Sequence, residues 1–502
     1  MKRKTSMLII CATLILSADK TLLAQKDEDP IKEPYRPQIH FTPGAHWMND
    51  PNGLVYYNGV YHLFFQHYPG ASNWGPMHWG HAISRDLIHW KREPIALYPD
   101  SLGYIFSGSA VVDKENTSGF GVGGKVPLVA IFTHHDTARE RARRVDVESQ
   151  SIAYSLDEGK TWTKYGGNPV IKNPGVRDFR DPNVMWYAPT RRWILTLAAQ
   201  DRIIFYSSSD LKAWTKESEF GVGLGSHGGV WECPDLFALP VRAGGLSSGG
   251  RDSVWVLSVS IGWGGPNGGN GTQYFTGKFD GHVFIPDDKE IKWVDHGRDD
   301  YAGVTWSNTG NRRIFIGWMA NGEYAGSVPT EVWRSGNTLP RELGIDKVNG
   351  RYFLVTKPVK ELGILEEGWK GFKDSVRIQA PFELRLETGV VGSFKVVLSN
   401  DAGERVVIGF DKEWYVDRRG AGREDFHKGF AGRHTAPRIS QSKTLSLALV
   451  VDVASLELFA DGGLTVMSEL VFPSKPYNKI EVVGEDGVVM RTLRVTKLKG
   501  IW

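Results

Sequence analysis

The stretch Trp47-Met48-Asn49-Asp50-Pro51-Asn52-Gly53 surrounds one carboxylate with an aromatic ring and two amides. As backbone, Asp50-Pro51-Asn52-Gly53 predicts a type I turn, because Asp caps the first position, Pro presets φ at the second and Gly closes the turn. Most strings of this kind are turns and nothing more. In this chain a second Asp-Pro-Asn recurs in Arg180-Asp181-Pro182-Asn183, and a proline-flanked acidic group stands in Trp231-Glu232-Cys233-Pro234-Asp235. Three carboxylates therefore lie at the ends of three predicted strands.

Strand patterns fill the chain around these motifs, from residue 53 to residue 333. Short alternating or apolar segments end at Gly, Asn, Asp or Pro, and long helical periodicity is absent. The clearest segments are residues 54–57, 61–65, 193–197 and 314–318. This region is therefore predicted to be all β.

A loose repeat runs through the same region. A strand, a Ser/Asp turn and a Trp that opens the next strand recur at residues 84–90, 155–162 and 209–214. The spacing of roughly 50–70 residues is typical of four-stranded propeller blades, and about five such blades fit the region. A large irregular sandwich is the alternative.

The pattern changes after residue 343. Residues 358–362 predict a short helical connector that begins at a proline. Alternating strands then return at residues 382–386, 394–398 and 445–451, which is the pattern of a β-sandwich of roughly 130 residues. The segment 418–432 is rich in charge and glycine and is expected to be a solvated loop.

Length and composition agree with two globular domains. A chain of 502 residues is too long for one ordinary core, and 41% apolar with 23% charged residues is typical of globular proteins. We therefore expect an all-β chain with a five-bladed β-propeller and a C-terminal β-sandwich. The expected boundaries are 36–345 for the propeller, 346–372 for a linker and 373–502 for the sandwich.

The N-terminus has the pattern of a signal peptide at residues 1–24. Lys2-Arg3-Lys4 precedes an apolar run at residues 7–16, which is too short to span a bilayer. Residues 1–24 contain four basic residues and one acidic residue, so the remainder carries 56 of each and gives no support to nucleic-acid binding. Cys233 is the only cysteine beyond the signal, so no internal disulfide is expected. Secretion or a periplasmic location in a bacterium is expected, and the oligomeric state is not predicted.

The three carboxylates suit the chemistry of glycosidic bonds, which requires one carboxyl group that keeps a proton and one that stays ionised. Asp50 is the candidate nucleophile, because backbone N–H groups of a turn would lower the pKa of its carboxyl. Glu232, between an aromatic residue and a cysteine, is the candidate acid. Asp181 beside Arg180 is a candidate positioning group whose charge would stabilise a cation-like transition state. Each alone is more readily a turn cap or an ion pair, but the three together favour catalysis.

Two other motifs are weaker candidates. His134-His135-Asp136 resembles a set of metal ligands, but adjacent histidines on a strand point to opposite faces, so a loop turn is the favoured interpretation. The glycine-rich run at residues 262–271 lacks the ending and the following helix of a phosphate loop, and it fits a mobile loop near a binding face. No metal site is predicted.

Several motifs along the mature chain form a familiar set. They are His46-Trp47-Met48-Asn49-Asp50-Pro51-Asn52-Gly53, Phe64-Phe65-Gln66 with Trp74, Met77-His78-Trp79-Gly80-His81-Ala82, Phe106-Ser107-Gly108-Ser109, Phe179-Arg180-Asp181-Pro182, Trp231-Glu232-Cys233-Pro234-Asp235, Gly271-Thr272-Gln273-Tyr274-Phe275 and Thr338-Leu339-Pro340-Arg341-Glu342-Leu343. Through them the chain resembles glycoside hydrolase family 32, the secreted β-fructofuranosidases that include inulinases, levanases and invertases.

The resemblance implies a five-bladed propeller followed by a β-sandwich, and retaining hydrolysis without a cofactor. It implies that Asp50 is the nucleophile, Asp181 the transition-state stabiliser and Glu232 the acid/base. The implied substrate-binding residues are Trp47, Asn49, Gln66, Trp74, Phe106, Ser107, Arg180, Tyr301 and Trp318. Two positions depart from the family pattern: Asp299-Asp300-Tyr301-Ala302 lacks the usual aromatic before the Tyr, and Ala454 stands where a Ser is common.

The expected activity is release of terminal fructose from inulin or levan, with some action on sucrose. Residues 116–121 and 150–155 resemble exo-acting inulinases and levanases more than strict sucrose invertases. A fructosyltransferase on the same scaffold is an alternative, because water and sugar compete for one covalent intermediate. A non-catalytic fructan-binding propeller and a metal-dependent enzyme are further alternatives. Linkage preference, exo or endo action and the role of the sandwich stay open.

Overall fold

The computed structural model of the chain describes residues 33–241, 253–485 and 487–502. The predicted signal peptide lies outside the described residues. The described part is almost entirely β, as predicted, with one α-helix, α1 (Thr137–Arg141), and the short 3₁₀-helices η2 (Lys360–Leu365) and η3 (Asp461–Gly463). None of these helices has the length and apolarity that a membrane crossing requires.

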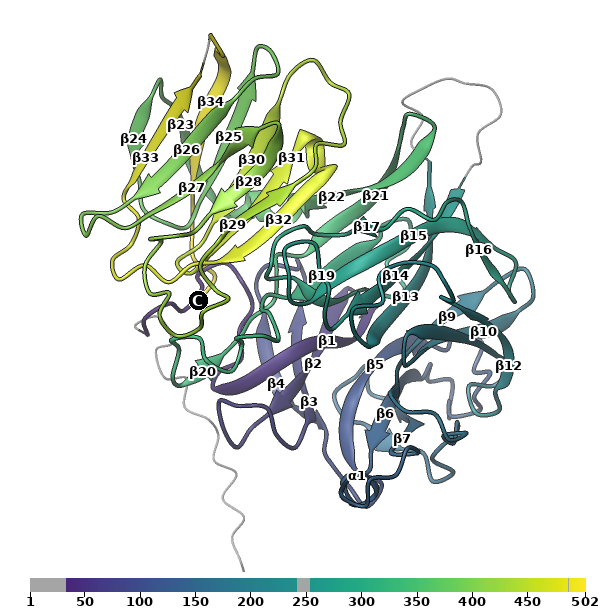
Figure 1. Ribbon diagram of the computed structural model, residues 1–502. Coiled ribbons are helices and arrows are strands. Elements are labelled where there is room, and N and C mark those ends of the chain that lie inside the picture. Colours follow the sequence, from purple (N-terminus) through teal and green to yellow (C-terminus); the bar gives the residue numbers. More distant parts are fainter. Residues whose placement is uncertain (1–32, 242–252, 486) are drawn as a thin grey trace, which may run out of the picture.

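The first part of the described chain forms five sheets (Figure 1). The first contains β1 (His46–Tyr57), β2 (Val60–Tyr68), β3 (His78–Ser84), β4 (Lys91–Leu97) and the late strand β20 (Trp333–Arg334), which runs parallel to β1. The second contains β5 (Tyr104–Val112), β6 (Leu128–His135), β7 (Glu148–Ser155) and β8 (Thr163–Lys164). The third contains β9 (Phe179–Tyr187), β10 (Arg192–Ala199), β11 (Arg202–Ser208) and β12 (Thr215–Phe220). The fourth contains β13 (Trp231–Pro240), β14 (Ser253–Ile261), β15 (Gly271–Phe279), β16 (Phe284–Pro286) and β17 (Lys292–Trp293), and the fifth contains β18 (Tyr301–Thr305), β19 (Ile314–Trp318), β21 (Arg341–Val348) and β22 (Arg351–Pro358).

The first strands of the five sheets form a closed ring. β1 contacts β5, β5 contacts β9, β9 contacts β13, β13 contacts β18, and β18 contacts β1. The other strands of each sheet follow its ring strand in antiparallel order, apart from β20. Residues at similar depths of the five ring strands can therefore face one another.

The Ser/Asp turns predicted from the repeat are confirmed in three of these sheets. Each joins a third strand to a fourth: β3 to β4, β7 to β8, and β11 to β12. In the first, Oδ1 of Asp86 accepts hydrogen bonds from the backbone N–H groups of Ile88 (3.0 Å) and His89 (2.8 Å). Asp210 caps the corresponding turn of the third sheet in the same way. The repeat in the sequence is thus the repeat of one hairpin.

The C-terminal part forms two six-stranded sheets that share a core, and we call them the C-terminal sheets. One contains β23 (Glu366–Gly371), β25 (Phe382–Thr388), β30 (Ser446–Val451), β31 (Ser455–Ala460), β32 (Thr465–Leu470) and β34 (Met490–Leu498). The other contains β24 (Ser375–Arg377), β26 (Phe394–Ser399), β27 (Arg405–Asp411), β28 (Glu413–Asp417), β29 (Arg433–Ala436) and β33 (Lys479–Gly484). Apolar side chains of both sheets, such as Leu384 and Val396, belong to one buried cluster.

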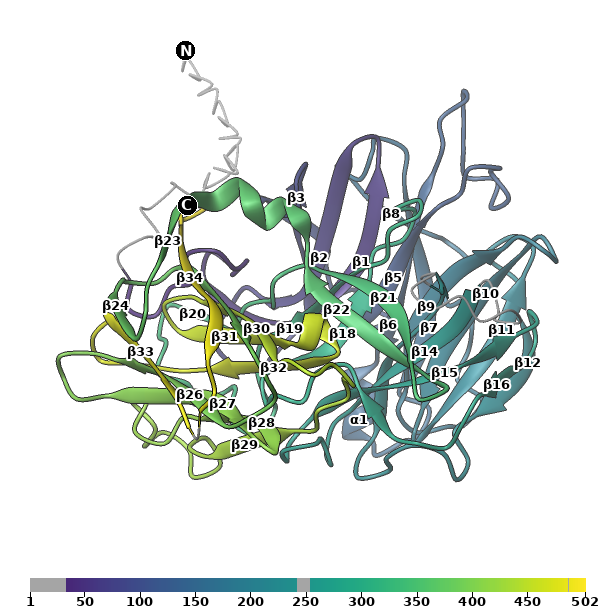
Figure 2. The same cartoon turned by 90° about the horizontal axis from the view of Figure 1, so that it is seen from above.

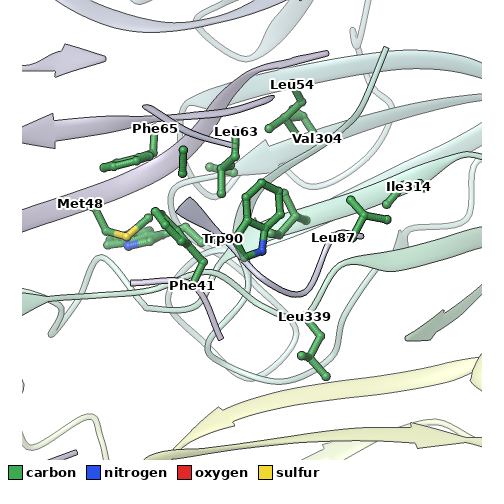
Figure 3. Packing of buried hydrophobic residues seen from close by; sticks show 14 of the residues in the cluster. Phe41, Met48, Leu54, Leu63, Phe65, Leu87, Trp90, Val304, Ile314 and Leu339 are labelled. Carbon is green, nitrogen blue, oxygen red and sulfur yellow. The ribbon is translucent and has the colours of Figure 1, made fainter. Parts of the chain in front are cut away.

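The C-terminal sheets pack directly against the ring of sheets (Figures 1 and 2). One buried apolar cluster contains Met48 from the first sheet, Trp90 just before β4, Val304 from the fifth sheet, and Val450 and Phe459 from the C-terminal sheets. Figure 3 shows part of this cluster. Residues 346–372, which the sequence indicates as a linker, contain the end of β21 and all of β22, η2 and β23.

The predicted turn at Asp50-Pro51-Asn52-Gly53 is wrong, because these residues lie inside β1. Pro51 pairs with Phe65 and Asn52 pairs with Phe64 of β2. Pairing with a neighbouring strand has overridden the local preference for a turn.

One further local prediction is wrong, and another holds only in part. His134 and His135 end β6 instead of forming a loop turn, and Asp136 caps α1 with its side chain. Residues 418–432 are a loop between β28 and β29, as predicted, and most of them are exposed or partly exposed, but Arg418 and Phe430 are buried against Tyr324. The acidic residues that pair with the buried Arg418 come from distant segments. The charge of the local sequence is therefore a poor guide to the exposure of Arg418.

Candidate active site

Each of the five ring strands has an interruption in its pairing near its start. The interruptions lie between Met48 and Pro51 in β1, Ile105 and Gly108 in β5, Arg180 and Asn183 in β9, Glu232 and Asp235 in β13, and Tyr301 and Val304 in β18. Bulges of this kind redirect side chains and are frequent beside active sites. Pro182 and Pro234 stand in two of the gaps, where a missing N–H costs no ladder hydrogen bond. The proline motifs of the sequence therefore mark bulges.

Asp50, Asp181 and Glu232 lie at three of these bulges, and the first two meet at Cys233. The Sγ atom of Cys233 lies 3.5 Å from Oδ2 of Asp50 and 3.7 Å from Oδ2 of Asp181. The backbone N–H of Cys233 donates to the same Asp181 oxygen (3.0 Å). Asp181 has a φ of 63° and Cys233 a φ of 46°, a left-handed conformation that costs energy in non-glycine residues and often occurs at functional sites.

The Asp50 carboxylate is held by side chains and not by the N–H groups of a turn. Ser107 Oγ donates to Oδ2 (2.6 Å), and Asn49 Nδ2 donates to Oδ1 (3.0 Å). The expected lowering of its pKa is wrong: burial, helped by the charge of Glu232, raises the pKa of Asp50, and the donors Ser107 and Asn49 only partly oppose this.

Asp181 is the more deeply buried of the two aspartates that contact Cys233. Burial raises its pKa well above the ordinary value, the charges of Glu232 and Asp50 act in the same direction, and Arg180 opposes them. Three acidic groups so close together disfavour simultaneous ionisation. The arrangement therefore favours different protonation states for its members, which is a common property of acid/base sites.

Glu232 lies between a cation and a phenol. Arg180 donates to Oε1 from Nη2 (2.9 Å) and Nε (3.1 Å), and Tyr301 donates its hydroxyl to Oε2. About a quarter of the Glu232 side chain is exposed, so a substrate oxygen can reach it. Arg180 is fixed in turn by Glu148 (3.1 Å) and Asp178 (2.8 Å).

The other predicted binding residues surround this cluster. Trp47 Nε1 donates to Asn49 Oδ1 (2.8 Å), and the Trp318 ring lies 6.0 Å from that of Trp47 and 6.4 Å from that of Tyr301. Two residues are one step further away. Trp74 contacts the ring of Phe106 (6.0 Å), and Gln66 donates to Asn52 (2.8 Å) instead of to a carboxylate.

Sequence reasoning missed one part of the site and located another only as a loop near a binding face. Glu148 is buried, accepts the N–H of Phe179 (2.6 Å) and lies 3.6 Å from His135, but nothing near it in the sequence distinguishes it. Gly262 stands beside the acid candidate, since a Cβ built on it would lie 3.9 Å from Oε2 of Glu232. Trp263, next to it, is 53% exposed. Both residues belong to the glycine-rich run at residues 262–271 that the sequence indicated as a loop near a binding face.

Asp235 does not join the carboxylate cluster. It accepts hydrogen bonds from the N–H (2.7 Å) and hydroxyl (2.6 Å) of Thr305 and lines a separate cavity of about 310 Å³ with Asn183, Trp186 and Arg313. Within the described ranges, no group of three or more His, Cys, Asp or Glu side chains is arranged to hold a metal ion.

Two family models together match nearly the whole described chain. Residues 40–358 match the glycosyl hydrolases family 32 N-terminal domain, and residues 359–499 match the glycosyl hydrolases family 32 C-terminal model.

Individual relatives agree with the family models. The chain is 44% identical to a levanase of Bacillus subtilis (strain 168), over 100% of this chain and 76% of that protein. It is 36% identical to an extracellular exo-inulinase of Aspergillus niger, over 91% of this chain and 93% of that protein. The crystal structure of an exo-inulinase from Aspergillus awamori matches with a TM-score of 0.85 at 34% identity, over 94% of this chain and 99% of that one.

Proposed function

This chain belongs to glycosyl hydrolases family 32, and we propose that it is an exported enzyme that releases terminal β-D-fructose from inulin or levan, and from sucrose. The observation that carries the proposal is the convergence of Asp50, Asp181 and Glu232 from three ring strands at one centre. The names of the relatives, levanase and exo-inulinase, support fructans as the substrate class.

In the first step of the proposed reaction, an oxygen of Asp50 attacks the anomeric carbon of the terminal fructosyl unit. The bond from that carbon to the bridging oxygen breaks, and Glu232 gives its proton to the departing oxygen. Asp181 stabilises the positive charge that develops on the sugar ring. Ser107 and Asn49 favour the ionised form of Asp50 through their hydrogen bonds.

In the second step, Glu232 takes a proton from water, and the water oxygen attacks the same carbon. Asp50 leaves as a carboxylate, fructose is released, and two displacements retain the configuration. Arg180 and Tyr301 hold Glu232 through both proton transfers. Every proton moves between substrate, water and side chains of this chain.

The fold proposed for this activity is a five-bladed β-propeller at residues 36–345 followed by a β-sandwich at 373–502, with residues 346–372 between them. The closed ring of first strands supports the propeller, and the shared core of the C-terminal sheets supports the sandwich. Residues 1–24 are proposed as a signal peptide that is removed on secretion or transport to the periplasm.

The acid/base assignment is tested by Glu232→Gln, which keeps the shape of the side chain but removes its proton transfer. Fructose release from inulin is expected to fall at least about 100-fold, the usual contribution of general acid catalysis. Glu413→Gln, at an exposed position of β28, is the control and should leave the rate unchanged. Retention of more than about a hundredth of the activity would show that another group is the acid.

Product profiles over time on inulin, levan and sucrose test the type of reaction. Free fructose alone from the first minutes is expected for exo action, whereas a ladder of oligomers would mean endo action. An excess of fructo-oligosaccharides over free fructose at high sucrose would favour a transferase. Fructan binding without turnover would favour a binding protein and overturn the proposal.

A further inference from the structure

The residues that lead into Tyr301 are bonded to the C-terminal sheets. The backbone N–H of His296 donates to the carbonyl oxygen of Val466 (2.8 Å), and that of Asp299 donates to the carbonyl oxygen of Ser468 (3.1 Å). In return, the N–H of Ser468 donates to Asp295 Oδ1 (2.9 Å). The segment 295–300 therefore lies along β32 before the chain enters β18.

A buried arginine links this segment to the C-terminal sheets. Nη1 of Arg341 donates to Asp295 (2.9 Å) and Asp300 (3.0 Å). Its Nε donates to Glu457 of β31 (2.9 Å), and its Nη2 donates to Ser468 Oγ of β32 (2.5 Å). Arg341 and Asp300 have no exposed side-chain surface, so the link is dry.

A second buried arginine acts on the neighbouring aspartate. Arg418, from the loop after β28, donates to Asp299 Oδ2 (2.6 Å) and pairs with Glu469 of β32 (2.9 Å). The N–H of Leu470 donates to the same Asp299 oxygen (2.8 Å). Asp299 and Asp300, the two residues before Tyr301, are thus both linked to the C-terminal sheets.

The packing leaves this segment little freedom to move. A Cβ built on Gly297 would lie 2.2 Å from backbone atoms of Ser468, and one built on Gly317 would lie 1.8 Å from Oδ1 of Asp300. The backbone of the segment is therefore pressed against β32, and the Asp300 side chain is pressed against β19. Tyr301 follows directly, and its hydroxyl donates to Glu232.

We propose that the C-terminal sheets position Tyr301 against Glu232. Arg341 is the positioning residue, because it bonds both the C-terminal sheets and Asp300, the residue before Tyr301. The inference rests on the proposed function in one respect, that Glu232 is the acid/base. It gives the second domain a role in the reaction, although Glu457 and Ser468 lie in sheets that contribute none of the proposed site residues. The C-terminal sheets act on Asp299-Asp300, where the chain departs from the family pattern before Tyr301.

The expected signature lies in the pH dependence of catalysis. The Tyr301 hydroxyl donates to Oε2 of Glu232, so the loss of this hydroxyl should move the alkaline limb of the activity profile. Glu232 is also faced by Arg180 of β9, and it interacts with the charges of Asp50 in β1 and Asp181 in β9. Substitutions at Arg341 or Ser468 do not remove Arg180, Asp50 or Asp181.

The test compares Arg341→Lys, which keeps the charge but loses the fork that joins Asp300 to Glu457, with Tyr301→Phe. Arg341→Lys should lower kcat by about tenfold with little change in KM, and should move the alkaline limb in the same direction as Tyr301→Phe. In a Tyr301→Phe background, Arg341→Lys should shift the limb no further. Ser468→Ala loses one bond to Arg341 and one to Asp295 (2.7 Å) but leaves the ion pair between these two residues, and it should act in the same direction if Arg341→Lys fails to fold.

Val396→Ala is the matched control, because it opens a cavity in the core of the C-terminal sheets away from this link. It should lower Tm and leave the pH profile unchanged. The proposal is overturned if Arg341→Lys or Ser468→Ala behaves like this control, or if its shift persists without the Tyr301 hydroxyl. If the wild type releases no fructose, the proposed function fails by itself. In that case, crystal structures of the wild type and Ser468→Ala test the positioning role. An unchanged contact between Tyr301 and Glu232 in the variant would reject it.

Discussion

Ser107 and Asn49 are the two donors that most favour the ionised form of the Asp50 carboxylate, ahead of Cys233. Burial raises the pKa of Asp50, and Ser107 at 2.6 Å and Asn49 at 3.0 Å act in the opposite direction. A proposed nucleophile must be ionised to attack. The acid limb of the activity profile should therefore report how well these two donors hold the carboxylate.

Ser107→Ala tests this relation. The change removes one donor to the ionised form, so the pKa of Asp50 should rise further and the acid limb of kcat/KM should move to higher pH by roughly half a unit to one unit. Profiles of wild type and variant from pH 3.5 to 8 provide the measurement. Ser109→Ala is the control, because Ser109 Oγ bonds the N–H of Val184 and not a carboxylate. An unshifted acid limb in Ser107→Ala would show that Asp50 is not the group that the limb reports.

At the scale of elements, the sequence predicted the strands and the identity of the acidic residues better than their local geometry. Leu195 and Ile316 lie in strands where the apolar alternation indicates them, since that pattern follows directly from burial. The backbone bulge at Asp50 could not be predicted from this alternation. Its bulge exists because β1 pairs with β2 on both sides of it, and such pairing depends on residues far along the chain.

The same limit explains why Glu148 and Arg418 were not predicted. Glu148 acts by holding Arg180, a contact across 32 positions, and Arg418 is buried by partners more than 50 positions away. A single sequence shows residue types and local periodicity, but not which distant charges will meet. Residue motifs therefore identified the carboxylates that the structure brings together, whereas the residues that hold them required the fold.

The loop that starts at Gly262 is an element with a separate expected role. The N–H of Gly262 donates to the carbonyl oxygen of Val230 (3.1 Å), which ties the loop to the start of β13 beside Glu232. The acid of a glycosidase stands next to the leaving group. With Glu232 as the proposed acid, the exposed indole of Trp263, which follows Gly262, is expected to contact the sugar that departs. Aromatic rings bind sugars by packing against their apolar faces.

Trp263→Ala should therefore raise KM for inulin by about three- to tenfold, with a smaller effect on kcat. Methyl β-D-fructofuranoside, whose leaving group carries no sugar, should be hydrolysed as before. Trp369→Ala is the matched control, because Trp369 is 62% exposed on β23 in the C-terminal sheets. Equal losses on both substrates would show that Trp263 supports the fold of the site and not the leaving group.

For the whole molecule, the junction between the ring of sheets and the C-terminal sheets is unusually rich in buried charge. Arg341, Glu457 and Asp452 all lie there with almost no exposed surface. Buried ion pairs contribute little net stability compared with apolar packing, but losing one partner is costly because the other charge stays buried. The junction should therefore be sensitive to any titration that removes one member.

His40 is the member that titrates in an accessible range. Its ring contacts Asp452 through Nδ1 (2.7 Å) and Glu457 through Nε2 (2.8 Å). Burial alone would lower the pKa of His40, but the hydrogen bonds and charges of the two carboxylates together raise it to about 9. A base with a raised pKa stabilises the folded state fully below its unfolded pKa of roughly 6.5, and this stabilisation is lost as the pH rises to about 9.

The predicted result is a fall in Tm between pH 6.5 and 9 that His40→Gln largely abolishes, together with a lower Tm of this variant at pH 6. The shift corresponds to roughly 3 kcal/mol, or several degrees in Tm for a protein of this size. Calorimetry at pH 6, 7.5 and 9 at one scan rate provides the measurement. His62→Gln is the control: burial lowers the pKa of His62 to about 4, so its titration does not contribute above pH 6.5. Parallel Tm curves for wild type and His40→Gln above pH 6.5 would show that His40 is not charged in the folded protein, and that the junction is held without it.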